Sequence, residues 1–389
     1  MLLVAAVALT AGCGGGDTAP SPSGETGDRG LPAVPAGFPR PTVPADNPLT
    51  AGKVALGRHL FYDRRMSING ARSCADCHEQ RRAFTDGRAR AVGISADQVH
   101  PRSAMSLTNV VYNAAFNWAN PNLRSLERQA EAVLFNERPV ELGWADHEQE
   151  ILDRFRHDPL YLDLFERAYP GDPDPFTTRR VIQALASFER TLVSGDSAFD
   201  RYLRGDSEAL SPAARRGMDL FFGERLECFH CHGGFNFSQS VNHQGVVFDQ
   251  AEFHNTGLYN IDGRGAYPPD NRGLWEFTHK DTDMGRFRAP TLRNIALTAP
   301  YMHDGSIATL EAVLMTHYAR GGRLVTEGPY AGDGARNPYK SSLIAGFVLT
   351  EQERDEVLAF LQSLTDWDFI CNPAFSDPFG NIPMHERCP

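Results

Sequence analysis

The chain has 389 residues, of which 41% are hydrophobic and 10% aromatic, and this composition is typical of a globular protein with about two domains. Its formal net charge is −11 at pH 7. This charge argues against nucleic acid and anionic lipid surfaces as partners, because both require a basic footprint, and it permits docking to a basic face of another protein.

The N-terminal residues predict export from the cytoplasm. Residues 2–9 are apolar and lead to Cys13 through Leu9-Thr10-Ala11-Gly12. The pattern resembles a lipoprotein signal over residues 1–13, in which Cys13 becomes the lipidated first residue; an ordinary cleaved export signal is the alternative. The apolar run is too short to span a bilayer as a helix. Residues 14–36, rich in Gly, Pro and Ser, predict a flexible linker between the membrane and the fold.

Two Cys-x-x-Cys-His pentads follow, and they are the strongest signal in the chain. They consist of Cys74, Cys77 and His78, and of Cys228, Cys231 and His232. Each pattern is typical of a c-type haem, in which two thioethers hold the porphyrin and the His lies under the iron. Zinc is the weaker alternative because the gap between the pentads is not zinc-ribbon spacing, and a redox dithiol needs neither the His nor a second copy. We therefore expect two covalently bound haems.

The segments around the pentads predict a mainly α-helical fold. Apolar residues recur at helical spacing over four segments, whereas strand-like alternation is sparse: 148–168, 179–193, 310–318 and 351–364. Residues 235–288, rich in Gly, Asn, Asp and His, predict a long loop that covers a site. A Gly-x-x-Leu-Phe pattern precedes each pentad, at 57–61 and 217–221, which favours duplication of a haem domain.

We therefore expect two cytochrome c-like haem domains with long loops and little sheet. The N-terminal domain spans 37–205, the C-terminal domain spans 206–370, and residues 371–389 form a tail. Cys371 and Cys388 are expected to pair in an exported protein, closing a loop of 17 residues (388 − 371) worth about 3 kcal/mol. Two free thiols are the alternative.

Three segments resemble the bacterial dihaem cytochrome c peroxidase/MauG family: 56–63 (LGRHLFYD), 186–192 (ASFERTL) and 289–305 (APTLRNIALTAPYMHDG). Four others resemble its MbnH branch: 45–50, 100–107, 118–121 and 375–378. The resemblance spans residues 40–370. It implies that the N-terminal haem reacts with peroxide, while the C-terminal haem stores or relays oxidising equivalents.

The resemblance also implies roles for residues around the first haem. Trp118 matches a Trp between the haems that relays electrons, although a core Trp is the alternative. Gln129 and Glu141 match the pair above the reactive iron, and Glu141 is the expected acid/base, with Glu127 and Glu137 as its competitors.

Two further expectations concern what lies near the reactive haem. No His stands near Ile94, where peroxidases that need reductive activation carry a capping His, so an open iron site is expected; His100 is the alternative. Thr298 and Pro300 match main-chain carbonyls that hold a calcium ion, whereas Ser103 replaces the Asn of the third contact. An ordinary Pro-containing turn is the alternative.

The sixth ligand of the second haem decides between two functions. Counting from Thr298 without gaps places the family's ligand position at His317. Aligning instead on residues 319–322, with one inserted residue, places it at Tyr318, which we favour. Met315 is the third candidate. A Met ligand raises the haem potential and suits a peroxidase, whereas an anionic Tyr oxygen favours high-valent iron.

The resemblance and the N-terminal signal together lead us to expect a periplasmic oxidoreductase that is lipid-anchored through Cys13. It would use hydrogen peroxide to form a high-valent two-haem state that oxidises a partner protein, with Trp as the target. The alternative is a cytochrome c peroxidase that takes electrons from a small cytochrome. A plain electron carrier is a third reading, but it needs neither Gln129 nor Glu141.

Overall fold

The computed structural model describes residues 33–247 and 251–388. The predicted signal over 1–13, its lipid on Cys13 and most of the linker 14–36 lie outside the described residues. Within the described ranges, every helix is too short or too polar to cross a bilayer.

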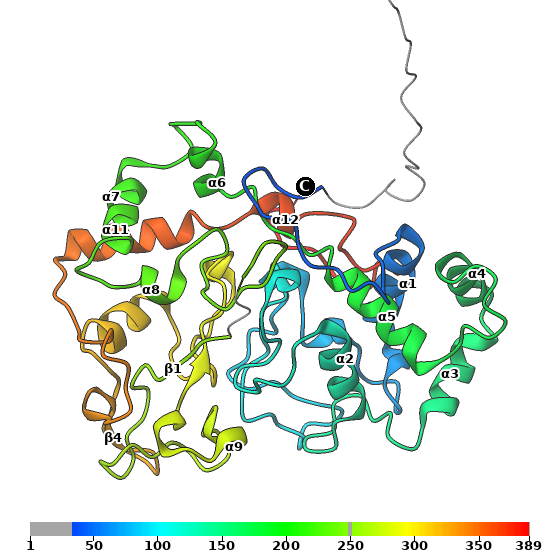
Figure 1. The fold of residues 1–389 in the computed structure, drawn as a ribbon, viewed down its shortest axis with the longest axis horizontal. Helices are drawn as coiled ribbons and strands as arrows, with labels where there is room; N and C mark the ends of the chain where they lie inside the picture. The colour runs from blue at the N-terminus through cyan, green and yellow to red at the C-terminus, as the bar shows by residue number, and fades with distance from the viewer. Residues whose placement is uncertain (1–32, 248–250, 389) are drawn as a thin grey trace, which may run out of the picture.

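The prediction of a mainly helical fold is confirmed. One half of the molecule carries the first five α-helices (Figure 1): α1 (Ala51–Tyr62), α2 (Leu126–Phe135), α3 (Glu148–Arg156), α4 (Pro159–Ala168) and α5 (Thr178–Glu189). The other half carries most of the rest: α6 (Ala198–Leu203), α7 (Pro212–Phe221), α8 (Phe229–His232), α9 (Trp275–Thr278), α10 (Leu310–Ala312) and α11 (Glu351–Gln362). The short helix α12 (Trp367–Ile370) lies between the halves (Figure 1).

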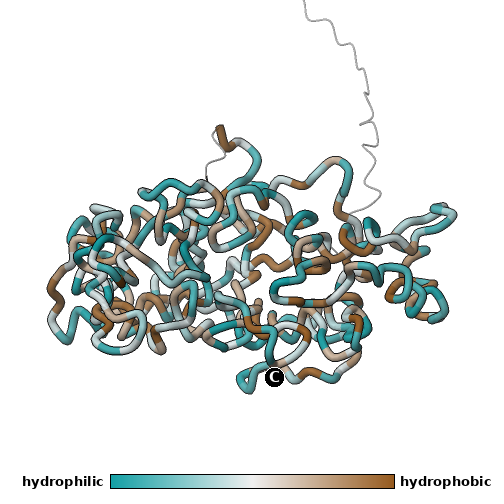
Figure 2. The backbone as a smooth tube through the Cα atoms, turned by 90° about the horizontal axis from the view of Figure 1, so that it is seen from below, coloured by the Kyte–Doolittle hydropathy of each residue, from teal (hydrophilic) through white to brown (hydrophobic). Residues whose placement is uncertain are grey.

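Sheet structure in the described residues is limited to short antiparallel ribbons. Strand β1 (Phe253–His254) pairs with β2 (Phe287–Arg288), so that Phe253 faces Arg288 in the register. Strand β3 (Leu324–Val325) pairs with β4 (Gly332–Asp333). Long loops connect these elements. Many of the loops on the outside of the molecule are hydrophilic (Figure 2).

The glycines of the two Gly-x-x-Leu-Phe patterns have the same structural role. Helix α1 packs on α5, where a Cβ on Gly57 would collide with the main-chain carbonyl of Ala184. Helix α7 packs on α11, where a Cβ on Gly217 would collide with the carbonyl of Glu356. Each pentad is thus preceded by a close helix crossing that only glycine permits.

The segment 148–168 forms two helices rather than the single helix that its apolar spacing suggested. Helix α3 ends at Arg156, and α4 begins at Pro159 with Asp158 as its N-cap. A carboxylate oxygen of Asp158 accepts a hydrogen bond from the Leu160 N–H at 2.9 Å. Proline has no N–H to continue a preceding helix, but it suits the first turn of a new one.

The core is divided between the halves, and the end of the chain returns to the first. One buried cluster combines α1, α4 and α5 with Phe369, Ile370 and Phe375. Another combines α7 and α11. Tyr62 in α1 donates a hydrogen bond to the Phe375 carbonyl at 2.6 Å. A disulfide joins Cys371 to Cys388 across a separation of 17 residues. The domain boundaries at 205/206 and 370/371 stay a prediction.

Candidate functional site

The first cavity has a volume of about 230 Å³ and is lined by Cys74, Cys77 and His78 of the first pentad. The Nδ1 atom of His78 lies 2.9 Å from the Phe84 carbonyl oxygen. A carbonyl in this position holds the N–H on Nδ1 and leaves the Nε2 lone pair free, which is the usual arrangement for a metal-binding His. Burial lowers the pKa of His78, so the ring is neutral and able to ligate.

Both residues expected above the first iron line this same cavity. Gln129 projects from α2, and its buried Oε1 has no hydrogen-bond partner among the described residues. Glu141 lies in the loop that follows α2, where Asn136 Nδ2 donates to its Oε1 at 3.2 Å. The structure thus brings an unsatisfied acceptor and an oriented carboxylate into one cavity.

The competitors of Glu141 are placed elsewhere. Glu127 does not line the cavity; its carboxylate pairs with Arg190 at 2.7 Å and accepts from Asn47 at 2.7 Å. Glu137 is exposed at the surface. Ile94 also does not line the cavity, whereas His100 does, with its Nε2 3.4 Å from Glu141 Oε1. The open iron site stays a prediction.

Glu189 lines the first cavity as well, and the sequence analysis missed it. It is the last residue of α5, where the apolar surroundings raise the pKa of its carboxyl to about 8. The helical period could have revealed this position, because Glu189 stands one turn after the buried Leu185.

The second cavity also has a volume of about 230 Å³ and contains Cys228, Cys231 and His232. His232 repeats the arrangement of His78, with Nδ1 3.0 Å from the Phe237 carbonyl oxygen. Burial lowers the pKa of His232 to about 4, so its Nε2 lone pair is available at neutral pH.

Of the three candidates for the second haem's other ligand, Tyr318 alone lines this cavity. His317 is fully buried and does not line the cavity; its Nε2 lies 3.2 Å from Oγ1 of Thr256. Met315 packs against the hydrophobic cluster of α7 and α11.

The local backbone explains why the side chain next to His317 reaches the cavity. The predicted helix over 310–318 is α-helical only for its first residues and continues as a π-helical segment, Val313–Tyr318. Its wider turn shows in the bond from the Ala319 N–H to the Leu314 carbonyl at 2.8 Å. A π-turn accommodates one extra residue in a helix, and such turns are frequent at functional sites.

Trp118 belongs to a wall that the two cavities share. Ser103, Ala104, Met105 and Trp118 each line both of them. The indole Nε1–H of Trp118 donates to the Ser103 carbonyl at 2.9 Å, and the Trp118 carbonyl accepts from the Arg288 N–H at 2.8 Å. The first bond holds the ring and the second holds the main chain of Trp118.

The residues expected to hold calcium lie near this wall. Thr298 and Pro300 line the second cavity. Ser103 donates its N–H to the His303 carbonyl at 2.9 Å, which joins the wall to the 298–305 segment. Calcium binding stays a prediction.

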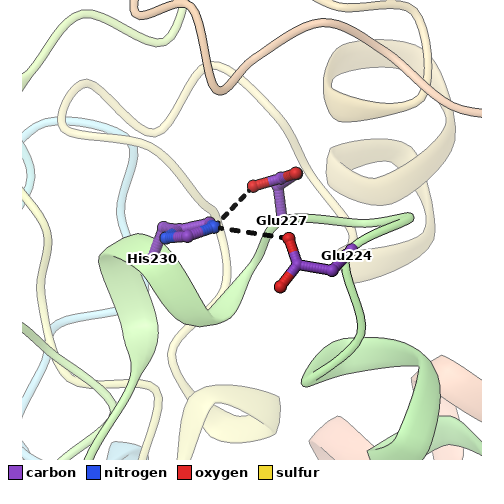
Figure 3. Close-up of side chains that lie close together, drawn as sticks. All are labelled: Glu224, Glu227 and His230. Carbon is purple, nitrogen blue, oxygen red and sulfur yellow. Dashed lines mark ion pairs between the residues drawn. The ribbon is translucent and has the colours of Figure 1, made fainter.

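A small charged cluster marks the attachment loop of the second pentad (Figure 3). His230 Nε2 lies 2.6 Å from a carboxylate oxygen of Glu227 and 4.0 Å from one of Glu224. Glu224 is 82% exposed, so the cluster faces solvent. Its member Glu227 also lines the second cavity.

The two cavities fit c-type haems. The four pentad cysteines are free thiols placed in the cavity walls, and each cavity is lined by a His whose Nδ1 lies against a main-chain carbonyl. The residues around them are mainly apolar, as a porphyrin face requires.

Comparisons with known proteins agree with this arrangement. The profile of the family described as di-haem cytochrome c peroxidase matches residues 51–208. The chain is 35% identical to the methylamine utilization protein MauG of Methylorubrum extorquens, over 90% of this chain and 89% of that protein. It is 33% identical to the cytochrome c peroxidase Ccp of Escherichia coli, over 73% of this chain and 57% of that one. A solved structure of a MauG-like protein associated with microbial copper homeostasis superposes with a TM-score of 0.87 at 48% identity, covering 89% of this chain and 98% of that chain.

Proposed function

The chain belongs to the dihaem cytochrome c peroxidase/MauG family, and from this premise we propose that it is a periplasmic enzyme that uses hydrogen peroxide to oxidise a partner protein, with a Trp side chain as the target. Membership of this family means that the chain is a dihaem oxidoreductase, and it implies two c-type haems. Peroxide and a redox protein are the typical reactants of the family. The oxidation of a protein residue and the periplasmic, lipid-anchored location are our proposals.

The observation that carries the proposal is the placement of Tyr318. The phenol of Tyr318 lines the same cavity as His232, where it would be available to a haem iron, whereas the thioether of Met315 does not line it. A phenolate oxygen favours oxidised iron, whereas a thioether raises the potential and suits electron uptake from a cytochrome. The residue that faces the cavity therefore favours storage of oxidising equivalents over acceptance of electrons.

Each cavity contains its own set of residues that would hold a haem. Cys74, Cys77 and His78 would hold the first haem. Four residues would hold the second: Cys228, Cys231, His232 and Tyr318. When bound, haem iron supplies the cleavage of the peroxide O–O bond and holds the two oxidising equivalents that result.

Glu141 would take a proton from the peroxide oxygen nearer the iron and return it to the leaving oxygen, which departs as water. Its carboxylate faces the cavity and is oriented by Asn136, which supports this role. The unpaired Oε1 of Gln129 would accept a hydrogen bond from the bound peroxide. Trp118, which lines both cavities, would shorten the path of an electron from one to the other.

A test is to mix the diferric protein with hydrogen peroxide and follow near-infrared and Mössbauer spectra. Reaction of both haems without prior reduction supports the proposal. Reaction only after one haem has been reduced by a small cytochrome would instead establish the peroxidase activity that the Escherichia coli relative's name describes. A Trp-containing partner that gains oxygen mass only with peroxide and this protein together would identify the substrate class.

A further inference from the structure

A buried arginine in the second cavity lacks the partner that such residues normally have. Among the described residues, three arginines are buried: Arg190, Arg288 and Arg293. Arg293 forms a bidentate pair with Asp200 at 2.8 and 2.9 Å, and Arg190 pairs with Glu127 at 2.7 Å. Arg288 is only 3% exposed, and within 33–247 and 251–388 no carboxylate lies within 4.0 Å of it.

The contacts of the Arg288 guanidinium are weak for a buried cation. One nitrogen lies 3.3 Å from Asn113 Oδ1 and another 3.8 Å from the sulfur of Met105, while Nε has no partner among the described residues. Burial alone lowers the pKa of Arg288 to about 10, which records the cost of an unpaired charge there. A buried charge is normally retained only when an anion compensates it.

No carboxylate of the described residues supplies that anion in the cavity that Arg288 lines. Only two carboxylates of the described chain, Asp86 and Glu227, line the same cavity, and neither pairs with Arg288. A c-type haem attached through Cys228 and Cys231 brings two propionate carboxylates into this space. Arg–carboxylate pairs are the strongest of the charged hydrogen bonds because the guanidinium donors match both oxygens.

We propose that Arg288 binds a propionate of the second haem and so holds the propionate edge of that haem against the wall that contains Trp118. The N–H of Arg288 donates to the Trp118 carbonyl at 2.8 Å, so one residue contacts the propionate through its side chain and Trp118 through its main chain. Its guanidinium also touches Met105, which lines both cavities. Arg288 is a positioning residue that orients the second haem toward the first.

The experiment compares R288M and R288K in the protein with both haems attached, with R286M as the control. Arg286 stands two residues away at a partly exposed position and pairs with Asp283 at 3.6 Å. Loss of the positive charge beside the second haem favours its ferric form. In R288M we expect the ferric-to-ferrous ratio at a given potential to rise about tenfold, which is a fall of about 59 mV in spectroelectrochemistry. R288K retains most of the wild-type potential, and R286M is unchanged.

A second readout reports the propionate itself. The propionate-bending band of the second haem in resonance Raman spectra shifts in R288M and not in R286M. An unchanged potential and band in R288M with both haems attached would overturn the proposal, as would equal shifts in R288M and R288K. If R288M loses the second haem, R288Q takes its place: a shifted band supports the proposal and an unchanged band and potential overturn it. Neither readout depends on which substrate is oxidised, so the result is independent of the proposed function.

Discussion

The indole of Trp118 donates a hydrogen bond to the Ser103 carbonyl at 2.9 Å, and both residues line both haem cavities. This bond holds an oxidisable ring in the wall between two metal sites. We therefore expect it to affect electron transfer between the sites more than the chemistry within either one.

Substitution W118F tests this relationship. We expect both haems to attach, and transfer of oxidising equivalents to the second haem to slow by at least about tenfold, the effect of ~1.4 kcal/mol on the barrier. Stopped-flow absorbance of the two haems after peroxide addition measures it. W144F is a matched control, because Trp144 is buried, donates to the Met66 carbonyl at 2.7 Å and lines neither cavity. Equal slowing in both variants would contradict the relay role.

Glu141 is expected to control the reaction with peroxide. E141Q keeps the size of the side chain but removes the base, so the bimolecular rate with peroxide should fall by about 10²–10⁴ without loss of haem. The rate of absorbance change at the first haem measures this. E137Q, at an exposed position outside the cavity, should retain the wild-type rate. A wild-type rate in E141Q would exclude Glu141 as the acid/base.

Tyr318 is expected to determine the spin state of the second haem. Y318F removes the only oxygen of that side chain in the cavity, so the second haem should change from low spin to high spin in electron paramagnetic resonance spectra. M315L, a substitution of similar volume outside the cavity, should leave the spectrum unchanged. The reverse outcome would make Met315 the ligand and favour the peroxidase function.

Glu189 should make stability depend on pH. The pKa of its carboxyl is raised by burial from 4.5 to about 8 in the folded protein. Between these values the unfolded chain releases a proton that the folded protein retains. Its contribution to the free energy of unfolding is therefore complete below pH 4.5 and decreases toward pH 8, by at most about 1.4 kcal/mol per pH unit. Guanidinium unfolding at pH 5, 6 and 7 should show a smaller decrease in E189Q than in the wild type, and parallel curves would contradict the burial argument.

The sequence alone could locate those parts of the candidate site that are formed by residues close together in the chain. The two pentads indicated where both cavities lie. The resemblance to the family pointed to Gln129, Glu141 and Trp118, and the structure has all three in the cavity walls. The break between α3 and α4 could also have been read from Asp158 and Pro159.

Other features depend on packing that no local pattern contains. Apolar spacing does not distinguish an α-turn from the π-turn that separates Tyr318 from His317, because both bury one face of the helix. Arg288 resembles any other arginine until the fold shows that it lacks a carboxylate. The assignment of Glu189 to the first cavity likewise depends on how α5 packs.

Residues near the C-terminus of the chain pack into the core of the first half. Phe369, Ile370 and Phe375 complete the cluster that α1 and α5 begin, and Tyr62 bonds to the Phe375 carbonyl. The core of the first half is therefore complete only when residues 369–375 are present. A single-haem fragment cut near residue 205 would lack Phe369, Ile370 and Phe375, and would leave this side of the first cluster exposed.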